Sequence, residues 1–271
     1  MGKIICFDSD GCVMDTMEVK HRRCFGPCFL AEFCLTQWAD TLQTRWNEIN
    51  LYETTRGINR FKGLALILRE VDAKYTPVPG LAALEQWTQE SRELSEPALA
   101  AAIAAAPDGD GRACLEKALA WSRATNAAIA ALPEDVKTAF PGAKEGLALV
   151  AAHARVAVVS SANRDAVYAE WSRCGLLDFV DEVLAQDSGT KADCLRRLCG
   201  EAAPADILMV GDAPGDRAAA EKNGVWFYPI LARREAESWA AFPDAAAKFL
   251  RGEFGDVQAD LQKKFEENLR K

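Results

Sequence analysis

The chain has 271 residues, 49% of them hydrophobic, and a formal net charge of −8 at pH 7. This length and apolar content predict a real core plus a smaller second unit, while the acidic balance argues against nucleic-acid binding. The nine cysteines occur singly and there are only two histidines, so we expect no zinc site and no disulfide framework, but reduced thiols in the cytoplasm. No signal peptide or membrane-spanning stretch is visible, and we expect no membrane partner.

The apolar run of residues 4–7 and the polar residues directly after it form the most informative segment. The run predicts a short buried strand, and Asp8 and Asp10 follow at its carboxyl end, where α/β folds build active sites. Side chains two apart on an extended segment point the same way, so Asp8 is a candidate nucleophile and Asp10 a candidate general acid. Carboxylates also suit Mg²⁺. The alternative is an ordinary turn, because acids and the following Gly11 are common turn residues.

A long helical region follows the first strand. From about residue 17 to residue 139 the apolar spacing is almost wholly helical, and a parallel sheet cannot continue through it. Breaks at 77–80 and 107–111 divide this region into separate helices. Pro133 and the pair Pro141-Gly142 are expected to mark the return to the sheet.

Strands and helices then alternate regularly. Mainly apolar segments predict strands at 155–159, 207–210 and 225–228, and a shorter strand is predicted at 180–184. Helices are predicted at 143–152, 164–174, 192–200 and 216–223. Such alternation predicts an α/β fold with a Rossmann-like, doubly wound parallel sheet. The tail from about residue 231 is charged and helical, with an aromatic stripe that we expect to cover the flank of the core. A dimer contact is the alternative, so we expect a monomer or a weak homodimer.

Polar residues also follow the later core strands. Ser160 and Ser161 follow the strand at 155–159 and can hydrogen-bond a phosphoryl oxygen. Asp212 and Asp216 follow the strand at 207–210, and Lys191 lies between these two groups, where its ammonium could neutralise Asp8 and a phosphate. Each residue has a plainer alternative: Ser160 or Asp212 as a helix cap and Lys191 as a surface charge.

The order of these motifs, DxDGxxxDT, a strand ending in Ser, Lys and then GDxxxD, resembles the haloacid dehalogenase superfamily of phosphohydrolases over about residues 1–16 and 140–230. The resemblance implies that Asp8 forms an aspartyl-phosphate and that Asp10 is the general acid that then activates water. It implies that Ser160 and Lys191 hold the transferring phosphoryl group.

The resemblance also implies a cofactor and a domain organisation. Mg²⁺ would be bound by Asp8, by the main-chain carbonyl of Asp10 and by Asp212, with Asp216 as a further ligand or as a neighbour of the ligands. Residues 1–16 and 140–271 would form the catalytic core. Residues 17–139 would form a helical cap of the C1 type, which in this superfamily closes over the active site.

Asp10 narrows the expected reaction. In the dehalogenases of this superfamily the residue two after the nucleophile is not an acid, whereas a phosphate ester needs its leaving alkoxide protonated. The chain is therefore predicted to be a Mg²⁺-dependent phosphatase that hydrolyses the phosphate monoester of a small metabolite. A non-catalytic protein that binds a phosphorylated ligand is one alternative.

Residues of the expected cap should select the substrate. Arg56 and Arg60 lie among three cations and two glycines at 56–63, a composition suited to an anionic or polyhydroxylated leaving group, although an exposed helix–loop junction would look the same. The segment resembles the substrate loop of β-phosphoglucomutases, which makes a phosphosugar mutase a second alternative. Those mutases carry a hinge histidine where this chain has Lys20. His21 follows, rotated by about 100° on a helix, and we expect it at the surface.

Overall fold

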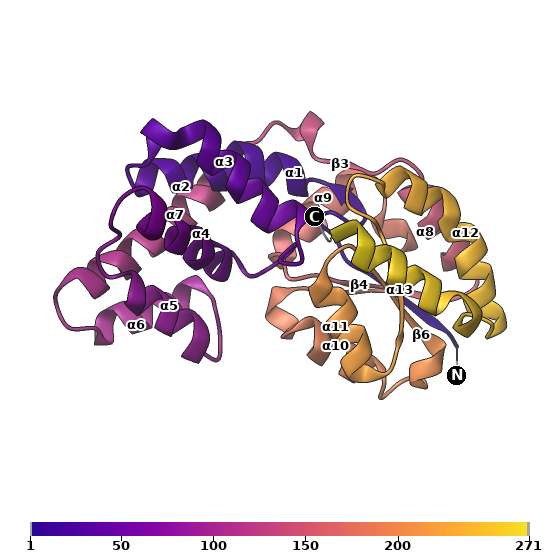
Figure 1. Cartoon of the computed structure of the whole chain (residues 1–271). Coiled ribbons are helices and arrows are strands. Elements are labelled where there is room, and N and C mark those ends of the chain that lie inside the picture. The colour runs from indigo at the N-terminus through magenta and orange to yellow at the C-terminus, as the bar shows by residue number, and fades with distance from the viewer. Residues whose placement is uncertain (1, 270–271) are drawn as a thin grey trace. The chain divides into compact units, whose positions relative to one another are not determined.

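A computed structural model describes residues 2–269 of the chain. The chain divides into two compact units, which Figure 1 shows in ribbon form. The core unit runs through Met17 and resumes at Pro133, and the helical unit is Glu18–Leu132. Among the described residues, every helix is too short or too polar to cross a membrane.

A single parallel sheet of five strands organises the core unit. The strand order is β5-β4-β1-β6-β7, with bounds Glu182–Leu184, Arg155–Val159, Ile4–Phe7, Ile207–Gly211 and Trp226–Pro229. All four pairings are parallel, and Phe7 of the central strand β1 is in register with Val158 of β4 and Val210 of β6. The predicted doubly wound parallel sheet is therefore confirmed. Its carboxyl edge brings the ends of β1, β4 and β6 together.

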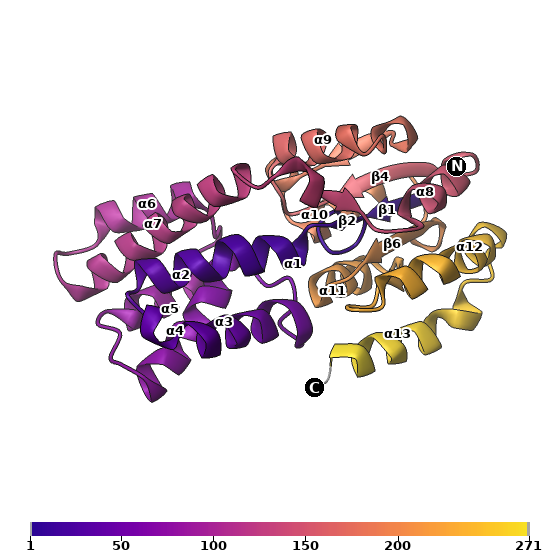
Figure 2. The ribbon, with the colours of Figure 1, turned by 90° about the horizontal axis from the view of Figure 1, so that it is seen from above.

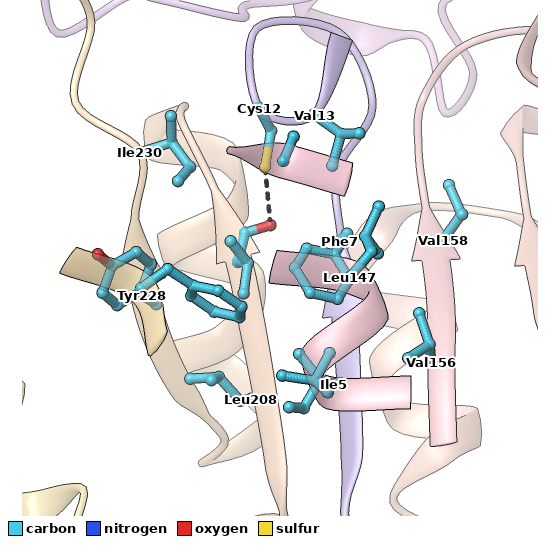
Figure 3. Close-up of a cluster of buried hydrophobic side chains, with 14 of the residues drawn as sticks. Ile5, Phe7, Cys12, Val13, Leu147, Val156, Val158, Leu208, Tyr228 and Ile230 are labelled. Carbon is cyan, nitrogen blue, oxygen red and sulfur yellow. Dashed lines mark hydrogen bonds between the residues drawn. The ribbon is translucent and has the colours of Figure 1, made fainter. Parts of the chain in front are cut away.

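Helices cover both faces of this sheet, because successive residues of a strand point to opposite faces. On one face, Ile5 and Phe7 pack in a cluster with residues of α8 (Ala143–Ala151), α9 (Arg164–Arg173) and α12 (Glu235–Arg251). Figure 3 shows part of this cluster. On the other face, Ile4 and Cys6 pack with residues of α10 (Lys191–Leu198), α11 (Pro214–Asn223) and α13 (Gly255–Leu269).

The C-terminal tail covers the flank of the core, as its aromatic stripe predicted. Trp239, Phe242, Phe249 and Phe254 are buried in the first cluster, and Leu250 packs against it. The helix α13 packs along the edge strand β7, where the side chain of Gln258 accepts a hydrogen bond from the amide of Phe227. The tail therefore shields an edge that would otherwise present unpaired backbone groups.

Two short strands connect the core unit to the helical region. β2 (Met14–Asp15) pairs antiparallel with β3 (Thr138–Ala139), and the amide of Phe140 donates to the carbonyl oxygen of Val13. The helical reading of residues 17–139 is therefore wrong at its end, since two-residue strands carry too few positions for a periodic signal. This pairing ties the segment from Pro133 onward to the core unit.

The helical unit has a core of its own. Its α-helices are α1 (Met17–Lys20, shared with the end of the core unit), α2 (Gly26–Glu32), α3 (Ala39–Asn47), α4 (Arg60–Lys74), α5 (Leu81–Glu90), α6 (Glu96–Ala105) and α7 (Asp110–Ala130). The π-helical turns η1 (His21–Phe25) and η3 (Glu48–Tyr52) extend α1 and α3. Figure 2 shows the ribbons of α2, α3, α4 and α7 grouped together. Buried side chains such as Trp46 and Trp121 belong to the hydrophobic core that these helices share. The predicted breaks after α4 and after α6 are confirmed.

Short 3₁₀ turns occur in both units. They lie at Thr36–Trp38, Glu134–Val136, Leu177–Phe179, Gln186–Ser188 and Pro204–Asp206.

Candidate active site

Asp8 stands at the carboxyl end of the central strand, on a segment that we call the acid loop (residues 8–13). The amide of Asp8 donates to the carbonyl oxygen of Val210 at 3.0 Å, which continues the β1–β6 ladder by one bond. Gly11 then turns the chain with a φ of +82°, a left-handed conformation that favours glycine. The carbonyl oxygen of Ser9 accepts hydrogen bonds from the amides of Cys12, Val13 and Met14. The acid loop is thus a compact turn on a rigid strand.

Lys191 and Asp8 form a buried ion pair. The Nζ atom of Lys191, the first residue of α10, lies 2.8 Å from Oδ2 of Asp8, and it also contacts the carboxylate of Asp216. Lys191 is therefore not the solvated surface charge of the plainer alternative. It joins residues that the sequence separates but the sheet topology brings to one edge.

Three carboxylates gather around this ion pair. Asp8, Asp212 and Asp216 each offer an oxygen, these oxygens lie within 4.8 Å of one another, and the residues are 6%, 1% and 0% exposed. A Cβ atom on Gly211 would lie 2.4 Å from Cγ of Asp216, so the glycine is needed for this close approach. The other Asp216 oxygen accepts the amide of Ala213 at 3.0 Å and so holds the carboxylate at the start of α11.

The electrostatics of this cluster favour a bound cation. Burial raises the pKa of Asp8 well above its usual range, Lys191 opposes the shift, and the carboxylates of Asp216 and Asp212 raise the pKa further. Burial lowers the pKa of Lys191, but Asp216 and Asp8 raise it, and the net shift is upward. Three carboxylates facing one ammonium leave surplus negative charge. Hard oxygen donors in such a cluster fit Mg²⁺.

Asp10 is held by a neighbour that sequence reasoning gave no role. The hydroxyl of Thr16, which is fully buried, donates to Oδ1 of Asp10 at 2.5 Å. Both residues belong to the motif of the first strand, so the signal was present in the sequence. Thr16 lies six residues after Asp10, and its hydroxyl reaches that carboxylate only because the chain turns at Gly11 and continues into β2. The sequence alone does not predict this contact.

Ser160 lies at the end of β4, next to β1, and is buried. Its amide donates to the carbonyl oxygen of Leu184 at 2.9 Å, and its hydroxyl accepts the amide of Ala162 at 3.1 Å. The cap of α9 is Asn163, whose side chain accepts the amide of Asp165 at 2.9 Å. The alternative of Ser160 as a helix cap is therefore wrong. Ser161 is exposed.

The two arginines predicted to bind substrate belong to the helical unit. Arg56 is buried and donates to the carbonyl oxygen of Leu51 at 2.6 Å. Arg60 donates from Nη1 to Asn126 at 2.7 Å and to Ser122 at 3.1 Å, and its guanidinium lies 5.0 Å from the centre of the Phe25 ring. These contacts fix both side chains within their own unit, and the substrate-binding role stays a prediction.

His21 is half-buried and packed within the helical unit, which differs in part from the expected surface position. Its ring stacks on Phe25 with centroids 4.6 Å apart, and its Nδ1 accepts the indole N–H of Trp46 at 3.0 Å. The π-turn η1 begins at this residue, and the ring is directed onto Phe25 and Trp46. The contacts give His21 a packing role in the helical unit.

The core unit is a Rossmann-like α/β fold. Three carboxylates and one lysine lie at the carboxyl edge of its sheet, which is where enzymes of this fold class place their active sites. The family model of haloacid dehalogenase-like hydrolases matches residues 3–224. The chain belongs to this family of hydrolases. The match ends before α12 and α13, which lie beyond it.

Comparisons with individual proteins add distant similarities only. A comparison with curated proteins found no match. A haloacid dehalogenase-like hydrolase from Xanthomonas campestris is 15% identical, with 97% of this chain and 94% of that chain covered and a TM-score of 0.47. CbbY from Rhodobacter sphaeroides in complex with phosphate is 19% identical (84% and 87% covered, TM-score 0.46). L-2-haloacid dehalogenase from Xanthobacter autotrophicus is 18% identical (89% and 82% covered, TM-score 0.42).

Proposed function

We propose that this protein is a Mg²⁺-dependent phosphatase that hydrolyses the phosphate monoester of a small metabolite through an aspartyl-phosphate. One observation carries the proposal: the Asp8 carboxylate lies 2.8 Å from Lys191 Nζ, inside a cluster of three buried acids at the carboxyl edge of the sheet. A nucleophilic carboxylate beside a fixed cation suits attack on an anionic phosphorus centre. We assign the helical unit, Glu18–Leu132, the role of the cap.

Mg²⁺ would be held by Asp8, Asp212 and Asp216, together with the main-chain carbonyl of Asp10. When bound, it neutralises phosphoryl charge and orients the ester. The three carboxylates supply the oxygen donors that such an ion prefers. Lys191 supplies a further positive charge beside Asp8, which lowers the repulsion between this carboxylate and the incoming phosphate.

The chain's own side chains carry both chemical steps. In the first, an oxygen of Asp8 forms a bond to phosphorus, the bond from phosphorus to the ester oxygen breaks, and Asp10 gives its proton to that leaving oxygen. In the second, Asp10 takes a proton from water while the water oxygen attacks phosphorus. The bond to Asp8 then breaks and inorganic phosphate leaves. Thr16 holds Asp10 from one side in both steps.

A panel of phosphate monoesters tests the proposal directly. The purified protein should release phosphate from at least one metabolite ester with Mg²⁺ and lose this activity with EDTA. Inorganic halide release from 2-haloacids should stay at background. Measurable Mg²⁺ binding without turnover of any ester would contradict the proposal and favour the non-catalytic alternative.

Asp10→Asn is expected to separate the two chemical steps. With p-nitrophenyl phosphate, whose leaving group needs little protonation, the variant should release a burst of one nitrophenolate per site and then turn over about 10²- to 10³-fold more slowly, because water is no longer deprotonated. With an alkyl phosphate the burst should be absent. Rapid-quench and steady-state assays measure both phases.

Asp206→Asn is the matched control for this experiment. Asp206 pairs with Lys3 just before β6, at the opposite end of that strand from Asp212, so its loss should leave both phases unchanged. Equal loss of activity toward aryl and alkyl esters in Asp10→Asn, with no burst, would argue against a general-acid role for Asp10.

Arg60→Gln tests the proposed substrate-binding role of the helical unit. For the best metabolite ester we expect KM to rise about tenfold, the size of one lost charged hydrogen bond, with kcat nearly unchanged. A small aryl phosphate should be hydrolysed normally. Arg69→Gln, on the same helix and paired with Glu85 at the surface, is the control. If both substrates were affected equally and the Tm fell, Arg60 would have a structural role through its hydrogen bonds to Ser122 and Asn126 instead of a role in substrate binding.

A further inference from the structure

We propose that two buried tryptophans, Trp171 of α9 and Trp239 of α12, are positioning residues that hold the acid loop. Their indole N–H groups donate to Ser9 and to Cys12, one in each half of the loop. The consequence for turnover rests on the proposed function of Asp8 and Asp10, which the same loop carries. The two hydrogen bonds that hold the loop lie within the core unit and do not depend on that function.

Trp239 fixes the C-terminal half of the acid loop. Its Nε1 donates to the carbonyl oxygen of Cys12 at 2.9 Å, and its ring, which is 1% exposed, stacks on Phe7 with centroids 6.0 Å apart. Two glycines of the segment after β3 leave room for it: a Cβ on Gly142 would lie 3.2 Å from Cβ of Trp239, and one on Gly146 would lie 2.8 Å from its ring. Within the core unit, Trp239 therefore contacts both the acid loop and the start of α8.

The helix that carries Trp239 is itself anchored. The hydroxyl of Tyr228 on β7 donates to the carbonyl oxygen of Ser238 at 2.5 Å, and the hydroxyl of Ser238 accepts the amide of Leu231 at 3.0 Å. These residues lie beyond the part of the chain that the family model matches. The C-terminal extension is thus joined to the site loop by a specific hydrogen bond as well as by apolar packing.

Trp171 fixes the N-terminal half of the loop. Its Nε1 donates to the hydroxyl oxygen of Ser9 at 2.9 Å, and both residues are buried. Ser9 stands between Asp8 and Asp10, and its carbonyl oxygen is the acceptor for the three amides that close the turn. A buried indole N–H strongly prefers a hydrogen-bond partner, so each bond restricts where the loop can lie.

Such restriction matters because reacting carboxylates must stay close to their productive positions, and a displacement of about 1 Å can cost 10²-fold in rate. Asp8 is already fixed by its bond to the β6 ladder and by Lys191. The remaining freedom lies in residues 9–13, which position Asp10. Loss of the indole donors should therefore loosen the loop and lower kcat while leaving KM almost unchanged.

Hydrogen exchange of the loop amides is the decisive measurement, because it reports on the loop whether or not the protein turns over a substrate. In Trp239→Phe and Trp171→Phe, which keep a six-membered aromatic ring but remove the indole N–H, we expect the peptide containing residues 9–14 to exchange at least about tenfold faster than in the wild type. Trp121→Phe is the matched control, since this indole is also fully buried and donates to the carbonyl oxygen of Phe25 in the helical unit, away from the loop. The peptide of β6 should not change in any of the three.

A second readout needs no substitution that could unfold the protein. In the wild type, the indole N–H protons of Trp171 and Trp239 should exchange much more slowly than that of Trp226 in NMR spectra.

Where an ester is turned over, kcat should fall about tenfold in the two loop variants, with KM within about twofold. Loop exchange equal to that of the wild type in both variants, or fast exchange of both indole protons, would overturn the proposal. Increased loop exchange without activity in the wild type would overturn only the proposed phosphatase.

Discussion

Asp8→Asn is expected to reduce the turnover of every phosphate ester by about 10⁴-fold or more, which is the size of effect seen when a catalytic nucleophile is removed. The amide keeps the shape of the side chain at the end of β1, but its oxygen is a poor nucleophile and cannot form the aspartyl-phosphate. Steady-state assays with an aryl phosphate and Mg²⁺ measure the loss. Trapping of a phosphorylated wild-type protein, absent in the variant, links the loss to the intermediate.

The same substitution should stabilise the metal-free protein. The pKa of Asp8 is raised on folding, first by burial, so the folded state holds this charge at a cost that the unfolded state does not have. The cost is absent below the unfolded pKa, where both states are protonated, and grows as pH rises towards the folded pKa. In EDTA we therefore expect Asp8→Asn to raise Tm by a few degrees at pH 7, with the gain shrinking towards pH 4.

Two outcomes would contradict this account of Asp8. Substantial activity in Asp8→Asn would remove Asp8 from the reaction. A lower Tm than the wild type at pH 7 in EDTA would show that the bond to Lys191 outweighs the cost of burial and crowding. Asp206→Asn, at the opposite end of β6, should change neither activity nor the pH dependence of Tm.

The sheet could be predicted from the sequence because its strands are buried on both faces. Residues 4–7 and 156–159 are continuously apolar, which is typical of a parallel sheet between two helical layers, and the strands predicted at 4–7 and 155–159 agree with β1 and β4. The strands β2 and β3 were missed because each has two residues and is defined by its partner. The pattern of apolar residues along the sequence predicts buried strands of four or five residues, but it does not predict two-residue strands, which exist only through their pairing.

The candidate site divides in the same way. Asp8 and Asp212 were predicted at one site because the topology of a parallel sheet brings strand ends to one edge. Lys191 was added to them from its charge and the order of the motifs, and the structure brings all three side chains together. The hydrogen bond from Trp239 to Cys12 joins residues 227 positions apart. The aromatic stripe of the tail predicted burial of Trp239 but could not indicate which carbonyl its indole would meet.

Mg²⁺ is expected to stabilise the core unit as well as to support turnover. Because three buried carboxylates face one ammonium, an ion that binds only the folded state relieves their repulsion. At a concentration 100 times its Kd it would add about 2.7 kcal/mol to the free energy of unfolding. For a chain of this size, that corresponds to a Tm increase of roughly 5–10 °C. Calorimetry with MgCl₂ and with EDTA measures the shift, and activity should vanish in EDTA and return with added Mg²⁺.

Asp212→Asn decides whether the shift comes from the proposed site. The variant loses one charged ligand but keeps the shape of the side chain after β6, so we expect it to fold, to lose most of the Mg²⁺-dependent rise in Tm and to turn over esters at least about 10²-fold more slowly. Ca²⁺, which prefers more ligands at longer distances, should stabilise the wild type without restoring its activity. If Mg²⁺ raised the Tm of Asp212→Asn as much as that of the wild type, the ion would be acting elsewhere on this acidic chain, and the metal site would have to be assigned to other residues.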